Sequence, residues 1–232
     1  MFTLQVQKPL NYFRIAWQSA SAAGLCLGLP AGLVLWLILL QRSNHSVVIE
    51  SLVSFLQVHG LYSIYFVVVS SILWSYLLGR ISGYRPWGWI AAASALGILV
   101  TWFSPLANVD GILYEYRPTL PIHLNYAASM VGLIGTVTLL VGFAYGLILR
   151  SLKAALTLGL TASFISVLIL LLTIFVFDLL GIRVGTGNLA MVKVTVVDLI
   201  TSALAGGMVL GVGFTQFVER GKRGEMKSTP ES

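Results

Sequence analysis

Six long apolar stretches constrain what this 232-residue chain can fold into more than any other feature of its sequence. Each is about 18–26 residues long, and a helix needs roughly 20 residues to cross a bilayer. None alternates polar with apolar residues, and backbone groups in lipid must find their hydrogen-bond partners internally. The sequence therefore predicts an all-α, polytopic integral membrane protein with a six-helix transmembrane bundle. The predicted spans are residues 21–40, 61–79, 87–103, 125–149, 155–180 and 192–217.

The composition agrees with lipid as the surrounding medium. Hydrophobic residues make up 57% of the chain and charged residues only 9%, whereas about a quarter of the residues of a soluble domain are charged. The mean hydropathy is +0.91. These values exclude a soluble enzyme, a nucleic-acid-binding domain and a disordered chain. Cys26 is the only cysteine, so the chain cannot form an internal disulfide.

Lysine and arginine predict the orientation, because these residues accumulate on the cytoplasmic side of membrane proteins. With both termini in the cytoplasm, the cytoplasmic segments carry more basic residues than the outer segments. We therefore expect an interfacial segment at residues 1–18, a membrane domain at 19–218 and a cytoplasmic tail at 219–232. The net charge of +6 then indicates contact with anionic lipid. The chain shows no transit peptide, which favours the inner (cytoplasmic) membrane of a prokaryote.

Glycines recur at intervals of four residues in three of the predicted spans. Small residues at this spacing let two helix backbones approach closely. Three uses are open: packing within one bundle, a homodimer face, or a surface for a flat cofactor. Pro30 should kink the first span, because proline lacks the N–H of an intrahelical bond. The glycines are Gly24, Gly28 and Gly32, then Gly142 and Gly146, then Gly207 and Gly211.

Two carboxylates lie within predicted spans. Asp178 is near the outer end of the fifth span, and Asp198 is deeper in the sixth, five residues after Lys193. A carboxylate at membrane depth is costly and suggests a function by default. The three residues form a candidate set for proton transfer or cation binding. The competing interpretation is a hydrogen bond or an ion pair between helices, such as Asp178 with Lys193, that fixes packing.

The three histidines, His45, His59 and His123, all fall on the predicted outer side. His59 and His123 begin the second and fourth spans, which run in the same direction, so their imidazoles should lie at similar depth. Imidazoles from two helices can hold a haem iron from its two faces. The sequence thus offers both as candidate metal ligands of one haem b. The competing interpretation is that they are ordinary residues of the membrane boundary.

Part of the chain resembles a known family. Residues 58–67, Val-His-Gly-Leu-Tyr-Ser-Ile-Tyr-Phe-Val, resemble the second helix of the haem-copper oxidase catalytic subunit, which bears an axial haem ligand. Residues 121–132, Pro-Ile-His-Leu-Asn-Tyr-Ala-Ala-Ser-Met-Val-Gly, resemble its fourth helix. The resemblance covers residues 10–150 and implies that His59 is an axial haem ligand. The family histidine that matches His123 is not a ligand.

The chain also departs from that family. The family has about twelve spans and begins its copper site with a histidine on the sixth helix, whereas residues 196–200 here read Val-Val-Asp-Leu-Ile. The resemblance therefore implies that this chain does not reduce oxygen by itself.

Three functions are open from the sequence. The first is a membrane subunit of a respiratory-type electron-transfer complex, which would hold one b-type haem near the outer face. Its partners would be other membrane subunits and a quinol or an outer-face redox protein. The second is a small transporter or channel that uses Asp198. The third is a non-catalytic accessory subunit of a larger membrane complex. No nucleophile and base are recognisable as a catalytic set.

Overall fold

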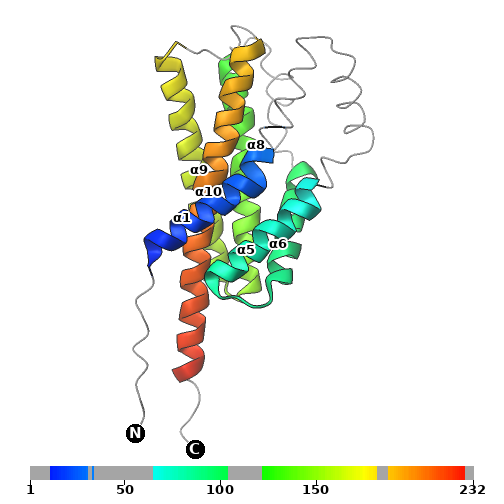
Figure 1. Cartoon of the computed structure of the whole chain (residues 1–232), viewed down its shortest axis with the longest axis vertical. Helices are drawn as coiled ribbons and strands as arrows, with labels where there is room; N and C mark the ends of the chain where they lie inside the picture. The colour runs from blue at the N-terminus through cyan, green and yellow to red at the C-terminus, as the bar shows by residue number, and fades with distance from the viewer. Residues whose placement is uncertain (1–10, 31–32, 34–64, 104–121, 182–187, 228–232) are drawn as a thin grey trace, which may run out of the picture.

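The computed structural model describes residues 11–30, 33, 65–103, 122–181 and 188–227, and every element in these ranges is helical. Three long helices run alongside one another, the shorter α5 and α6 lie beside them, and α1 crosses the bundle obliquely (Figure 1). The all-α prediction is therefore confirmed for the described part of the chain. The α-helices are α1 (Tyr12–Ala23), α5 (Ser70–Ser82), α6 (Trp87–Phe103), α8 (Ile122–Ile148), α9 (Leu152–Leu179) and α10 (Asn188–Lys227), and two π-helical segments are η1 (Gly24–Gly28) and η2 (Tyr65–Val69).

Three segments of the described chain are long and apolar enough to cross a membrane: Met130–Ile148, Leu152–Leu179 and Val196–Arg223. The apolar stretch Trp87–Thr101 of α6 is shorter. These four correspond to the third to sixth predicted spans. The first predicted span is described only over residues 21–30 and 33, and the second over residues 65–79, so the count of six stays a prediction. At 1.5 Å per residue, α10 is about 60 Å long, roughly twice the thickness of a hydrocarbon core.

Helices α8 and α9 form an antiparallel hairpin with close backbone contact. A Cβ atom on Gly142 would lie 2.7 Å from the Leu158 carbonyl oxygen, and one on Gly146 would overlap the backbone of Ala155. The turn places Arg150 in the left-handed region at φ 53°. Ser151 then caps α9 by accepting a hydrogen bond from the N–H of Ala154. The glycines of the fourth predicted span therefore serve contacts within the chain.

The glycines of the first and sixth predicted spans pack against each other's helices. Cβ atoms on Gly207 and Gly211 would collide with residues of α1, at Ala23 and Ser19 respectively. In return, a Cβ on Gly28 would lie 3.1 Å from the Ile200 Cα of α10. The sequence left three uses open for these glycines. The described ones take part in packing within one bundle. Gly32 lies outside the described residues.

Pro30 follows a π turn instead of regular α-helix. The N–H of Leu29 bonds to the carbonyl of Gly24, five residues back, which is the π pattern. Proline cannot donate a backbone hydrogen bond, and its ring crowds the carbonyl four residues earlier, here that of Cys26. A π bulge is one way for a helix to absorb such a disturbance.

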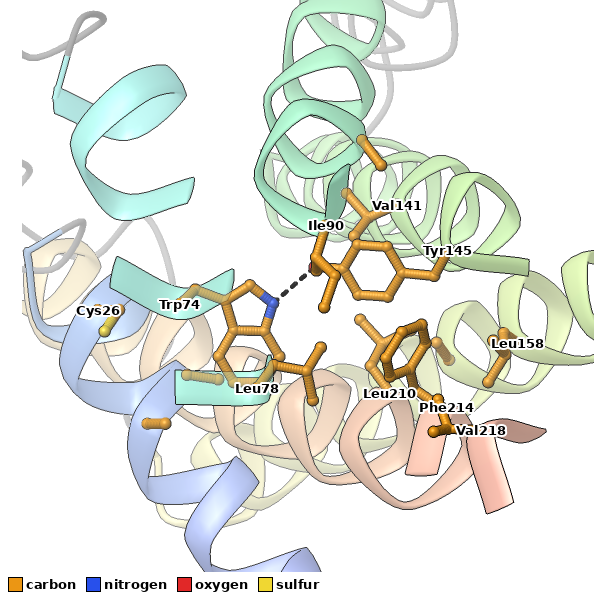
Figure 2. Close-up of a cluster of buried hydrophobic side chains, with 14 residues drawn as sticks. Cys26, Trp74, Leu78, Ile90, Val141, Tyr145, Leu158, Leu210, Phe214 and Val218 are labelled. Atoms are coloured by element: carbon orange, nitrogen blue, oxygen red, sulfur yellow. Dashed lines mark hydrogen bonds between the residues drawn. The ribbon is translucent and has the colours of Figure 1, made fainter. Parts of the chain in front are cut away.

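A buried cluster joins the helices at the level of α5 and α6. Trp74 and Leu78 of α5 meet Tyr145 of α8 and Phe214 of α10 (Figure 2). The rings of Tyr145 and Phe214 pack edge to face, with their centroids 5.6 Å apart. Such aromatic pairs add to the burial of their own surface. The cluster fixes the short α5–α6 hairpin to the long helices and so builds one side of the cavity described next.

Candidate functional site

A half-open cavity of about 270 Å³ lies between α1 with η1, α5, α6, α8 and α10. Its wall is mainly apolar, and Leu27, Ile98, Leu133, Ile134, Val137 and Leu210 are among the lining residues. Cavities of this kind, with a few polar groups on an apolar wall, are the usual form of small-molecule sites.

Two serine hydroxyls on the wall have no hydrogen-bond partner among the described residues. They belong to Ser71 of α5 and Ser202 of α10. Their residues are only 2% and 3% exposed. Buried polar atoms in folded proteins are almost always hydrogen-bonded. Within the described part of the chain, these two hydroxyls are therefore unpartnered polar groups on residues that line the cavity.

A chain of hydrogen bonds holds one side of the cavity in place. The indole Nε1 of Trp74 donates to the Tyr145 hydroxyl at 2.7 Å, and the Tyr145 and Ser94 hydroxyls are 2.6 Å apart. Ser94 donates to the carbonyl of Ile90 at 2.8 Å. Because the Ser94 proton is used there, Tyr145 is the donor to Ser94. The chain thus runs in one direction through α5, α8 and α6.

Asp198 is fully buried on α10, inside the segment Val196–Arg223 that could cross a membrane. It lies one helical turn before Ser202, and the next residue, Leu199, also lines the cavity. A fully buried carboxylate requires partners or protonation, since burial of an unpaired charge is very costly. The structure therefore places an ionisable group beside the cavity rather than on its wall.

Asp178 occupies a different environment from Asp198. It lies in the last turn of α9 and is exposed. The Thr173 and Thr201 hydroxyls, 3.5 Å apart, set α9 against α10 so that the two carboxylates lie at similar depth. Lys193 belongs to α10, but its side chain lies outside the described residues. The predicted pairing of Asp178 with Lys193 stays a prediction.

The described residues do not test haem ligation. His45 and His59 lie outside them, and His123 is the second residue of α8, with a side chain that is not described. The described part of the chain has no group of three or more histidine, cysteine, aspartate or glutamate residues that could hold a metal ion. None of the described lining residues of the cavity is a histidine. A haem held by His59 and His123 stays a prediction.

Sequence reasoning identified Asp198 but missed the serines. Ser71 and Ser75 are four apart on α5, and Ser94 faces them from α6, with the Ser75 and Ser94 oxygens 3.4 Å apart. Polar residues at a spacing of four inside an apolar helix indicate contact with another helix. This signal was present in the sequence, although it cannot tell a packed face from a cavity wall.

Comparison with protein-family models, with curated proteins and with solved structures finds no match to this chain. The resemblance to the haem-copper oxidase catalytic subunit is therefore neither supported nor contradicted.

Proposed function

We propose that this protein is a small membrane transporter or channel in which Asp198 is the ionisable group of the transport step. The main support is the position of this carboxylate: fully buried, in a helix long enough to span a membrane, and one turn from a serine on a cavity wall. Charged residues at membrane depth commonly mark ion pathways and proton relays.

The neighbourhood of Asp198 suits a proton or a small cation. Its carboxylate can release and rebind a proton, or it can supply oxygen ligands to a hard cation. Hydroxyls lie close by along the same helix, at Thr201 and Ser202. Ser166 of α9 is also fully buried and faces Gly206 of α10. These oxygens extend a polar strip along an otherwise apolar interface.

We also propose six spans with both termini in the cytoplasm of a cell with an inner membrane. The basic residues of three segments, the α5–α6 turn, the α8–α9 turn and the end of α10, support this orientation. The Lys222 ammonium lies beside Gly83, and the Tyr84 and Phe214 rings pack with centroids 5.4 Å apart. The segments therefore share one end of the bundle (Figure 1). That end would face anionic lipid headgroups. Its basic residues are Arg80, Arg85, Arg150, Lys153, Arg220, Lys222 and Arg223.

Proton flux into proteoliposomes tests the transport proposal. The vesicles carry a trapped pH-sensitive dye, and a potassium diffusion potential drives the flux. We expect wild-type vesicles to acidify faster than protein-free vesicles, and Asp198→Asn to lose this difference because an amide cannot carry a proton at neutral pH. Glu219→Gln is the control, since it removes a carboxylate of the same helix that pairs with Lys222 at 3.6 Å near the bundle end.

Two results would contradict the proposal. One is proton flux that exceeds that of protein-free vesicles and is equal in the wild type and in Asp198→Asn. The other is wild-type flux no greater than that of protein-free vesicles, both for protons and for sodium ions measured with a sodium-sensitive dye.

A further inference from the structure

We infer that the cavity is a binding site for a neutral molecule of one or two rings that carries a hydroxyl or carbonyl oxygen. This inference goes beyond the proposed transport of ions, and it does not depend on transport. It rests on the size of the cavity, on the chemistry of its wall and on the two serine hydroxyls without partners among the described residues.

The size admits an organic molecule rather than one or two waters. An apolar cavity of about 150 Å³ in another protein takes up benzene. The present cavity has about 270 Å³. It can therefore hold a molecule with two fused rings, or a single ring with substituents.

Water fills this volume less favourably than an organic molecule does, because the wall has few polar groups. A buried water makes about three hydrogen bonds and occupies about 30 Å³ of liquid volume, so a filled cavity would need many partners. Thr138 already donates to the Ile134 carbonyl at 2.7 Å, and the indole of Trp74 donates to Tyr145. The hydroxyls that stay available among the described lining residues are those of Ser71 and Ser202.

The arrangement of the wall favours a ring with a polar oxygen. Trp74 is 2% exposed, and its hydrogen bond to Tyr145 fixes the orientation of the indole before any ligand arrives. Preorganised aromatic surface binds with little loss of entropy. Each serine hydroxyl can both donate and accept, so the pair can serve a hydroxyl or a carbonyl. Neither serine carries a charge, and Asp198 is not on the wall, so the ligand is neutral.

Calorimetry with two matched probes tests this site. Purified full-length protein in detergent is titrated with 1-naphthol and with naphthalene, which differ by one hydroxyl, and micelles alone give the background. We expect saturable binding of one 1-naphthol per chain and weaker binding of naphthalene, by about tenfold for one hydrogen bond in a buried site. In the double variant Ser71→Ala with Ser202→Ala, the affinity for 1-naphthol should fall to that for naphthalene.

Two further variants separate the cavity from the rest of the protein. Val137→Phe on α8 and Ile98→Phe on α6 place a ring in the cavity from different helices. At least one of these variants that folds should therefore bind neither probe. Thr161→Val removes a hydroxyl from the exposed side of α9, which contributes no described lining residue, and it should bind both probes as the wild type does.

Several results would overturn the inference. They are the absence of saturable binding above the micelle background, equal affinity for the two probes, an unchanged affinity for 1-naphthol in the double serine variant, and binding retained in both folded phenylalanine variants. Because no flux is measured, a failure here leaves the transport proposal standing, and a failure of proton flux leaves this site standing.

Discussion

Trp74 and Tyr145 are joined by a hydrogen bond of 2.7 Å between two side chains that lie 71 positions apart in the sequence. Trp74 is on α5 and Tyr145 on α8, and both are buried. Ser94 accepts a hydrogen bond from the Tyr145 hydroxyl, so α6 belongs to the same network. This network fixes three helices around one side of the cavity. Because such polar contacts need all partners at once, the network also specifies one arrangement of these helices.

Replacing Tyr145 with phenylalanine should destabilise the fold. The variant keeps the ring against Phe214 but leaves the Trp74 indole N–H buried without its acceptor. Loss of this acceptor should lower the free energy of unfolding by about 1–2 kcal/mol, which is toward the upper end of the values for hydrogen bonds in membrane proteins. Reversible unfolding in mixed micelles of increasing denaturing-detergent content measures the change. Tyr12→Phe, at an exposed tyrosine of α1, is the control and should unfold as the wild type does. Equal stability of Tyr145→Phe and Tyr12→Phe would show that the network contributes little.

A methyl group at Gly146 should be far more damaging than one at Gly221. A Cβ at Gly146 would overlap the backbone of Ala155, and neither backbone can move without opening the α8–α9 hairpin. We expect Gly146→Ala to cost about 3 kcal/mol, at the upper end for overpacking. Gly221 lies on α10 with no atom near the position of a Cβ, so Gly221→Ala should leave stability unchanged or raise it by up to about 1 kcal/mol. The same unfolding assay compares them, and similar effects of the two changes would refute the close packing.

Tyr84 gives a prediction about pH. It lies in the turn between α5 and α6, where burial raises the pKa of its phenol above the ordinary value of 10, while the charge of Arg150 acts in the opposite direction. The folded protein therefore keeps this proton more tightly than the unfolded chain does. Its contribution to stability is complete below pH 10 and is lost as the pH rises toward the folded pKa.

Removal of the Arg150 charge tests this balance. In Arg150→Gln the phenolate loses a nearby positive charge, so the pKa of Tyr84 should rise further. An ultraviolet titration of phenolate absorbance, taken as the difference between each protein and its Tyr84→Phe version, isolates this group. A lower pKa of Tyr84 in Arg150→Gln would mean that the guanidinium does not stabilise the phenolate.

The apolar pattern predicted several helices to within a few residues. The expected span 87–103 coincides with α6, and the spans 125–149 and 155–180 differ from α8 and α9 by at most three residues at either end. In these stretches the same apolar side chains define both the helix and its burial in lipid. Turn residues such as Ser151, which caps α9, then determine where a helix begins or ends.

Hydropathy located the ends of other helices less well. The sixth span was expected at 192–217, but α10 continues to Lys227. Its last turns contain Glu219, Arg220 and Lys222, which end an apolar stretch although they are good helix formers. At the other end of the chain, α1 begins at Tyr12, within the expected interfacial segment, where Asn11 accepts a hydrogen bond from the N–H of Arg14.

The candidate site was only partly predictable for a physical reason. A charge inside an apolar stretch stands out in any sequence, so Asp198 could be identified. The cavity is made by five helical segments whose packing depends on contacts far apart in the chain, such as Gly28 against Ile200. No local pattern carries that information, and a serine such as Ser202 looks the same in sequence whether it lines a cavity or packs against a helix.

Access of water to Ser202 distinguishes a transport pathway from a sealed interior. Cys26 is the only cysteine of the chain, so Cys26→Ala gives a background in which a single new thiol can be followed. Thiols react with water-soluble methanethiosulfonate reagents as thiolates, and therefore only where water reaches them. If the cavity is part of a pathway, Cys26→Ala with Ser202→Cys should react in proteoliposomes. Ala162→Cys, at a fully buried position of α9 that does not line the cavity, should not react.

Bound 1-naphthol should slow the reaction at position 202, because the ligand would cover that side chain. A thiol at position 202 as unreactive as the one at 162, from both sides of the membrane, would place the cavity outside any pathway and would remove the main structural support for transport.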